Sequence, residues 1–84
     1  MFTYELKPSA LKDLKRLSPD VQKRIIKKLD YFVKTVSPLS KADRLVNHEI
    51  GEYRFRIGDY RVIFDHARDT FVILAIGHRR EIYK

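Results

Sequence analysis

Apolar and polar residues alternate at the start of the chain. Phe2, Tyr4 and Leu6 are each followed by a polar residue, and successive side chains of a strand point to opposite faces of a sheet. This period of two predicts a half-buried strand over residues 2–6 that ends at Pro8.

The spacing then changes to that of a helix. Ser9 is a candidate N-cap for a first helix, whose apolar positions share one face. These positions are Ala10, Leu11, Leu14 and Leu17. Ser18 is the next candidate cap, with Pro19 at the first helical position and Asp20 placed favourably for the helix dipole.

The second predicted helix carries a continuous apolar stripe. Its members are Val21, Ile25, Ile26, Leu29, Phe32, Val33 and Val36. Ser37-Pro38 ends it, because the residue before a proline disfavours helical backbone. The joint between the two helices is short, which predicts an antiparallel helical hairpin. In the less regular segment that follows, residues 41–43 are expected to form a short helical turn, Leu45-Val46 to begin a strand, and Gly51-Glu52 to turn.

The C-terminal half returns to strands. Residues 53–57 and 60–64 alternate on either side of Gly58-Asp59, a β-hairpin pattern. After a turn at residues 67–69, residues 71–76 are almost wholly apolar, as expected of a central strand covered on both faces. Gly77 is expected to release a polar C-terminal segment. The predicted fold is α+β with the order β-α-α-β-β-β: one domain over residues 1–84, in which a helical hairpin packs on one face of a small, twisted, mainly antiparallel sheet.

Charge narrows the choice of partner. The chain has 84 residues, 18 Lys+Arg against 11 Asp+Glu and a net charge of +7, which favours a polyanionic partner such as nucleic acid, a membrane surface or an acidic protein. Cysteine is absent, which excludes disulfides, thiolate catalysis and zinc sites built on sulfur. Neither a signal-peptide pattern nor a membrane-spanning run is evident, so a soluble cytoplasmic domain is expected.

The arginines of the two hairpin strands are expected to gather on one face. Arg54 and Arg56 alternate with the apolar residues of their strand, and Arg61 does the same on the next strand. If the apolar side chains face the helices, these three guanidinium groups converge on the opposite face, and Arg79 and Arg80 add to them from the C-terminal segment. Arginine forks match phosphate oxygens. The alternative is that these arginines only form a solvated outer face without a ligand. We favour this second interpretation for the lysines of the predicted helices.

Histidine and tyrosine supply the candidate proton-transfer groups. His78 follows a strand end among arginines, where neighbouring cations favour its neutral form; the alternative is a hydrogen-bonded surface residue. Tyr83 is a candidate for base stacking or proton donation, or else packs under the C-terminus. His48 and His66 are interpreted as structural or incidental. No metal-ligand spacing, glycine-rich phosphate loop or Ser-His-Asp arrangement is present, so no metal or cofactor is expected.

Two segments of the C-terminal half carry a family resemblance. Residues 53–64, Tyr-Arg-Phe-Arg-Ile-Gly-Asp-Tyr-Arg-Val-Ile-Phe, and residues 73–83, Ile-Leu-Ala-Ile-Gly-His-Arg-Arg-Glu-Ile-Tyr, resemble the RelE toxins of the RelE/ParE toxin–antitoxin superfamily. Residues 4–14 and the helical hairpin fit as well, so the resemblance covers essentially the whole chain. It implies the same fold and a type II toxin that stops translation by ribosome-dependent, metal-independent mRNA cleavage in the A site. It also implies a cognate RelB-like antitoxin, and operator DNA binding only by the toxin–antitoxin complex.

The resemblance also implies roles for individual residues. Arg61 matches the arginine that holds the scissile phosphate, and Arg79 matches a second arginine at the phosphate and leaving group. Tyr83 matches the tyrosine that stacks on the base and is a candidate for proton transfer. Arg54 and Arg56 match a basic pair that is two lysines in the best-known RelE; a guanidinium cannot act as a general base. His78 stands where that RelE has lysine, and Arg80 adds RNA-binding charge.

Two other functions compete with this hypothesis. ParE toxins have the same fold but bind DNA gyrase without cleaving RNA, and they usually lack the combination of Arg61, Arg79 and a terminal His/Tyr set. A relative with a degenerate site that only binds its antitoxin is the third possibility.

Overall fold

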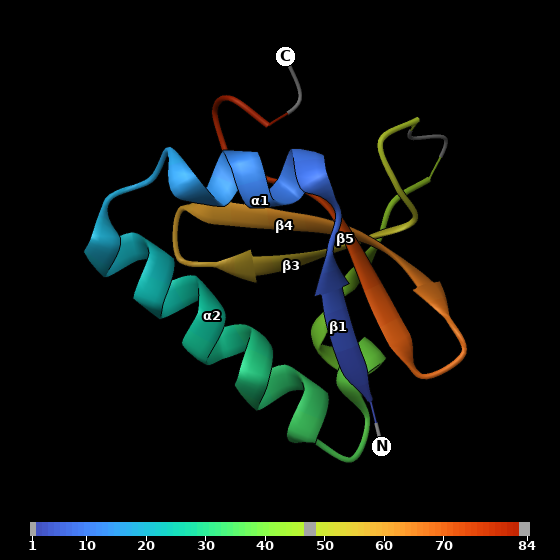
Figure 1. Cartoon of the computed structure of the whole chain (residues 1–84). Helices are drawn as coiled ribbons and strands as arrows, with labels where there is room; N and C mark the ends of the chain where they lie inside the picture. Colours follow the sequence, from blue (N-terminus) through green and yellow to red (C-terminus); the bar gives the residue numbers. More distant parts are fainter. Residues whose placement is uncertain (1, 47–48, 83–84) are drawn as a thin grey trace.

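One mixed sheet of five strands carries both helices on the same face (Figure 1). The computed structural model describes residues 2–46 and 49–82. Along the chain the elements are β1 (Thr3–Leu6), α1 (Pro8–Lys15), α2 (Pro19–Lys34), a 3-10 turn η1 (Pro38–Lys41), β2 (Asp43–Arg44), β3 (Tyr53–Ile57), β4 (Tyr60–Ala67) and β5 (Thr70–His78). None of the described helices is long and apolar enough to cross a membrane.

The strand order across the sheet is β1-β5-β4-β3-β2. Strand β1 pairs parallel to β5, and the other neighbours pair antiparallel. The connection between this parallel pair runs through both helices and strands β2, β3 and β4. The predicted α+β fold, with a mainly antiparallel sheet and both helices on one face, is therefore confirmed; the short strand β2 is not in the predicted order of elements, although a strand was expected to begin close by at Leu45-Val46.

The start of α2 follows the predicted capping. Ser18 Oγ accepts a hydrogen bond from the Val21 amide at 3.4 Å, and Pro19 is the first helical residue. For α1 the predicted Ser9 cap is wrong, because Lys7 is the N-cap and the helix begins at Pro8, two residues earlier than predicted; the fixed φ of proline suits the first helical position. Ser9 Oγ instead donates to the Leu74 carbonyl at 2.9 Å and so ties α1 to β5.

The segment after α2 forms the expected kinds of element at shifted positions. The helical turn η1 begins at Pro38 rather than Lys41, and the strand covers Asp43–Arg44 rather than Leu45-Val46. The Leu45 amide still donates to the Glu52 carbonyl at 2.8 Å, so pairing continues one residue past β2. Val46 points to solvent and is 74% exposed. Pairing to the edge of β3, rather than local sequence, decides where this strand lies.

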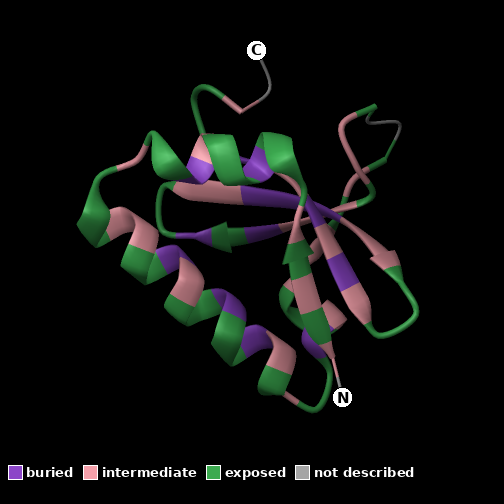
Figure 2. Cartoon of the chain, in the orientation of Figure 1, coloured by how far each residue is buried: buried purple, intermediate pink, exposed green. Residues whose placement is uncertain are grey.

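Stacked aromatic rings join the helices to the sheet. Phe32 of α2 lies 4.3 Å from Phe55 of β3, centroid to centroid, and Phe55 lies 4.4 Å from Phe64 of β4. Phe71 of β5 continues the row 5.0 Å from Phe64. Figure 2 shows the corresponding buried bands on the strands and along the inner side of α2. These rings fix which face of the sheet is apolar, and hence which face is left for polar side chains.

A bulge in β5 changes which residues face the core. Ile63 pairs with Ala75 and Phe64 pairs with Ile73, which leaves Leu74 as the extra residue. Ile73 and Ile76 are both in the core although they are three residues apart. The strand also continues through Gly77 and His78, two residues beyond the predicted end.

The sheet face away from the helices is partly covered. Ile63 is fully buried there, below Gly51. A Cβ atom at Gly51 would lie 2.7 Å from Ile63 Cγ2, so this close approach needs glycine. The Glu52 amide donates to Asp65 Oδ1 at 3.0 Å and holds the segment down. The second face is therefore open only at its other end, and β5 is less completely buried than predicted, since Val72 and Leu74 are partly exposed.

Candidate functional site

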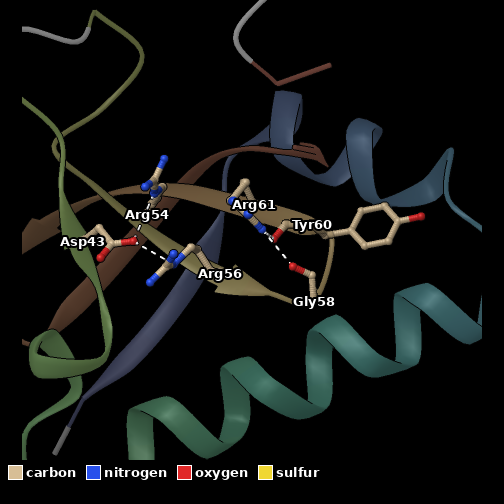
Figure 3. Close-up of polar contacts among 6 residues, drawn as sticks. All are labelled: Asp43, Arg54, Arg56, Gly58, Tyr60 and Arg61. Atoms are coloured by element: carbon tan, nitrogen blue, oxygen red, sulfur yellow. Dashed lines mark hydrogen bonds and ion pairs between the residues drawn. The ribbon is translucent and has the colours of Figure 1, made fainter. Parts of the chain in front are cut away.

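Three arginines lie together on the open part of the sheet. Arg56 of β3 and Arg61 of β4 are directly opposite each other, and Arg54 is two residues before Arg56 on the same face of β3. We call this surface, defined by Arg54, Arg56 and Arg61, the arginine face (Figure 3). The predicted convergence of the three side chains is confirmed. Its cause is the period of two, which sends the intervening apolar residues into the core.

An acidic residue that the sequence did not single out belongs to the arginine face. Asp43 is opposite Arg54 in the β2–β3 pair, and its Oδ2 lies 3.1 Å from Nε of Arg54 and 3.1 Å from Nε of Arg56. The exposed fractions of the three side chains are 40% for Asp43, 28% for Arg54 and 60% for Arg56. The ion pairs are thus partly screened by solvent. No sequence signal marked Asp43, because it lies in the irregular segment.

The β3–β4 turn holds Arg61. Nη1 of Arg61 donates to the carbonyls of Gly58 and Tyr60, both at 2.9 Å (Figure 3). Gly58 has φ of +59° at the first central position of this two-residue turn, which is where a type II′ hairpin places glycine. Within the described residues no carboxylate lies within ion-pair distance of Arg61. Its charge is therefore fixed in place by neutral carbonyl oxygens.

The same turn meets Arg79. The Arg79 amide donates to the Asp59 carbonyl at 2.8 Å, and Nε of Arg79 lies 3.7 Å from Asp59 Oδ1. Both side chains are more than half exposed, at 51% and 65%, so the backbone bond, not the ion pair, does most to place Arg79. The turn at Gly58-Asp59 thus contacts both arginines, Arg61 through the Gly58 carbonyl and Arg79 through Asp59. Arg80 is exposed.

His78 lies on the other face of the sheet. It is opposite Tyr60, and the two rings meet edge to face with centroids 5.5 Å apart. The bulge at Leu74 is the reason, since an unbroken alternation would have placed His78 on the face of Val72 and Arg61. Nδ1 of His78 accepts from the Arg80 amide at 3.2 Å, so a neutral His78 ring carries its proton on Nε2. The structure does not bring His78 to the arginine face.

His78 instead lines a cavity of about 360 Å³ between α1 and the C-terminal turn. Asp13 also lines this cavity, and its Oδ2 accepts a hydrogen bond from the Ile76 amide at 3.1 Å. This contact covers part of the edge of β5 that β1 leaves unpaired.

Other candidate residues have simpler positions or lie outside the described residues. Tyr83 and His48 are among the latter. His66 packs against Phe2 and Phe71, and its Nε2 is buried without a hydrogen-bond partner, in line with a structural residue. Over residues 2–46 and 49–82, no group of His, Asp and Glu side chains is arranged to hold a metal ion.

Comparison with known proteins identifies the family. A family model described as "ParE toxin of type II toxin-antitoxin system, parDE" matches residues 4–83. Comparison with curated proteins finds no match.

Several solved toxin–antitoxin complexes share the fold. A chain of the RelBE2 toxin–antitoxin complex from Mycobacterium tuberculosis has a TM-score of 0.81 and 25% identity over 93% of this chain and 98% of that one. A chain of the RelB-RelE complex from Methanococcus jannaschii has a TM-score of 0.69 and 26% identity, over 93% of this chain and 93% of that one. A chain of the intact E. coli RelBE complex has a TM-score of 0.71 and 16% identity, over 93% of this chain and 96% of that one. At this identity the likeness supports the fold alone. The chain therefore belongs to the ParE toxin family and is a type II toxin of the RelE/ParE superfamily.

Proposed function

We propose that this toxin is a ribosome-dependent mRNA interferase that cleaves mRNA in the A site without a metal ion. The observation that carries the proposal is that one hairpin turn contacts both Arg61 and Arg79 and lies at the end of the strand that carries the basic pair Arg54 and Arg56. Fixed guanidinium groups on adjacent strands suit a chain of phosphates, because each fork can bind two phosphate oxygens. Fixed positive charge also stabilises a phosphoryl transition state.

The chemistry needs no nucleophile from the protein. The RNA 2′-hydroxyl attacks the adjacent phosphorus, the bond from phosphorus to the 5′-oxygen breaks, and the products are a 2′,3′-cyclic phosphate and a 5′-hydroxyl. Arg61 would bind the non-bridging oxygens as their negative charge increases, and Arg79 would stabilise the leaving oxygen. The arginine face supplies no group for proton transfer, because arginine cannot act as a base and His78 lies on the opposite face of the sheet. Tyr83 is the remaining proposed proton-transfer and stacking group.

Dependence on the ribosome follows from the lack of a general base at this site. A site that supplies charge but little acid–base catalysis gains most when its substrate is already held in a reactive geometry. The A site holds mRNA in this way. Free RNA loses that advantage and should be cut poorly.

We propose a RelB-like antitoxin as the partner, because the similar structures are RelB–RelE or RelBE complexes. An acidic extended segment of the antitoxin would cover the arginine face, and the net charge of +7 favours such a partner. In this proposal the toxin acts in the cytoplasm, and operator DNA is bound only by the complex.

Gyrase inhibition is the second candidate function, and the ParE description of the matching family favours it. This mechanism gives no chemistry to Arg61 or Arg79. It therefore does not explain why the β3–β4 turn contacts both of these side chains.

Parallel assays on one preparation separate the candidates. Purified toxin is added to a defined translation reaction, with primer extension on the message, and to a gyrase supercoiling reaction. The proposal expects discrete cuts in the message and unchanged supercoiling. Lost supercoiling with an intact message would establish the gyrase mechanism, and no effect in either reaction would indicate a degenerate site.

A further inference from the structure

One carboxylate holds two members of the arginine face at once. Asp43 Oδ2 lies 3.1 Å from Nε of both Arg54 and Arg56, and Figure 3 shows it between them. Strand β2 is only two residues long, and its pairing places Asp43 opposite Arg54. Because both contacts use the same oxygen, the carboxylate fixes the two guanidinium groups relative to each other.

The contact atom determines what the arginines can still do. A guanidinium group is planar and carries five N–H donors. Asp43 meets both groups at Nε, as a hydrogen bond from Arg54 and as an ion pair with Arg56 (Figure 3), and a contact at Nε restrains the orientation of the group. A phosphate is bound best by two parallel N–H groups. A guanidinium group already held in one orientation also loses less side-chain freedom when it binds.

Charge repulsion makes such an anchor necessary. Arg56 and Arg61 are directly opposite on neighbouring strands, an arrangement in which like charges repel. Arg61 is held by the carbonyls of its turn, whereas Arg56 has no such carbonyl contact among the described hydrogen bonds. Asp43 supplies the negative charge that keeps Arg56 over the sheet instead of turned away toward solvent.

We propose that Asp43 is a positioning residue that orients Arg54 and Arg56 for the phosphates of bound RNA. This inference rests on the proposed function for the identity of its ligand. Asp43 does not itself attract RNA, because a carboxylate repels phosphate. Removing its charge alone would strengthen attraction to RNA, so a slower reaction after its removal has to come from lost orientation.

The first test measures the orientation and phosphate binding of Arg54 and Arg56 directly. The Nε–Hε signals of Arg54 and Arg56 are recorded by ¹⁵N NMR in the parent chain and in Asp43→Asn. We expect both signals to exchange faster with water in the variant, and to shift less than in the parent when inorganic phosphate is added. Asp20→Asn, the same change of charge at an exposed position in α2, is the control and should match the parent. Unchanged signals and an unchanged phosphate response in Asp43→Asn would overturn the proposal.

The second test measures cleavage in the translation reaction. We expect Asp43→Asn to cut about tenfold more slowly, because small misplacements of binding groups have effects of this order or larger, while Asp20→Asn keeps the parent rate. In an Arg54→Lys/Arg56→Lys background the charges remain but no planar fork is left to orient, so adding Asp43→Asn should change the rate less than twofold.

An equal loss in both backgrounds would mean that Asp43 acts by a route other than the orientation of the two arginines, which overturns a positioning role. Faster cleavage by Asp43→Asn would overturn it as well. If the parent chain cuts no message, the proposed function fails, and the NMR signals with phosphate still decide whether Asp43 orients the arginines.

Discussion

Replacing Arg61 by alanine separates a catalytic arginine from a structural one. The change removes the fork proposed to bind the phosphate oxygens in the transition state, and losses of this type are on the order of 100-fold or more in rate. That corresponds to roughly 2.7 kcal/mol, since each factor of ten is about 1.36 kcal/mol. The same change removes the hydrogen bonds from Nη1 to the Gly58 and Tyr60 carbonyls.

The structural cost of this change is small by comparison. Both carbonyls lie in a turn that water can reach, so we expect a loss of about 1 kcal/mol in the free energy of unfolding. In a domain of this size that lowers Tm by roughly 4–8 °C and leaves the chain folded at the assay temperature. The hundredfold loss of rate therefore cannot arise from unfolding.

The assay combines cleavage of a translated message with thermal melting of the same preparations. Lys27→Ala, an exposed position of α2, removes one positive charge elsewhere and should change neither quantity noticeably. Arg61→Lys keeps the charge without the fork and should give an intermediate rate. An Arg61→Ala protein that melts as expected and still cuts at the parent rate would refute the catalytic assignment.

Three further predictions test the fold and the partner. Gly51→Ala would place Cβ 2.7 Å from Ile63 Cγ2 and should cost about 1–3 kcal/mol of stability by overpacking, measured by urea denaturation. Burial raises the pKa of the Tyr4 phenol, and so do its hydrogen bond to Asp30 and the negative charge of Asp30. The stability that this phenol contributes should be fully present below about pH 10 and should be lost as the pH rises through its folded-state pKa. Thermal melts of Tyr4→Phe should lose this pH dependence. The rate of antitoxin association should fall about tenfold or more from low to high salt in stopped-flow traces, and a flat rate would exclude steering by charge.

Sequence patterns predicted the arginine face because alternation alone decides the side to which a strand residue points. Arg54, Arg56 and Arg61 alternate with residues that the stacked phenylalanine rings hold in the core, so their common face followed directly. The start of the second helix was equally predictable, since Ser18 and Pro19 mark it and a regular apolar stripe fills its inner side. Its end was predicted too late, because the helix stops at Lys34 and leaves Val36, which was expected in the stripe, exposed to solvent.

Features that depend on pairing could not be predicted in this way. The bulge at Leu74 reverses the alternation in β5 and sends His78 to the helix side, yet nothing in an unbroken apolar run shows where a bulge will occur. Asp43 escaped notice because a two-residue strand has no periodicity, and only its place beside β3 brings it to Arg54 and Arg56. Ser9 was misjudged as a cap because Pro8 suits the first helical position better.

The most direct measurement of the central claim compares one message in two states. The same mRNA, translated in a defined system or free in the same buffer, is treated with equal toxin, and the initial rate at which 2′,3′-cyclic phosphate ends form is measured. We predict that the translated message is cut on the order of 100-fold faster, because the ribosome supplies the geometry that this site lacks. Equal rates on the two substrates, or an intact message in both, would contradict the account.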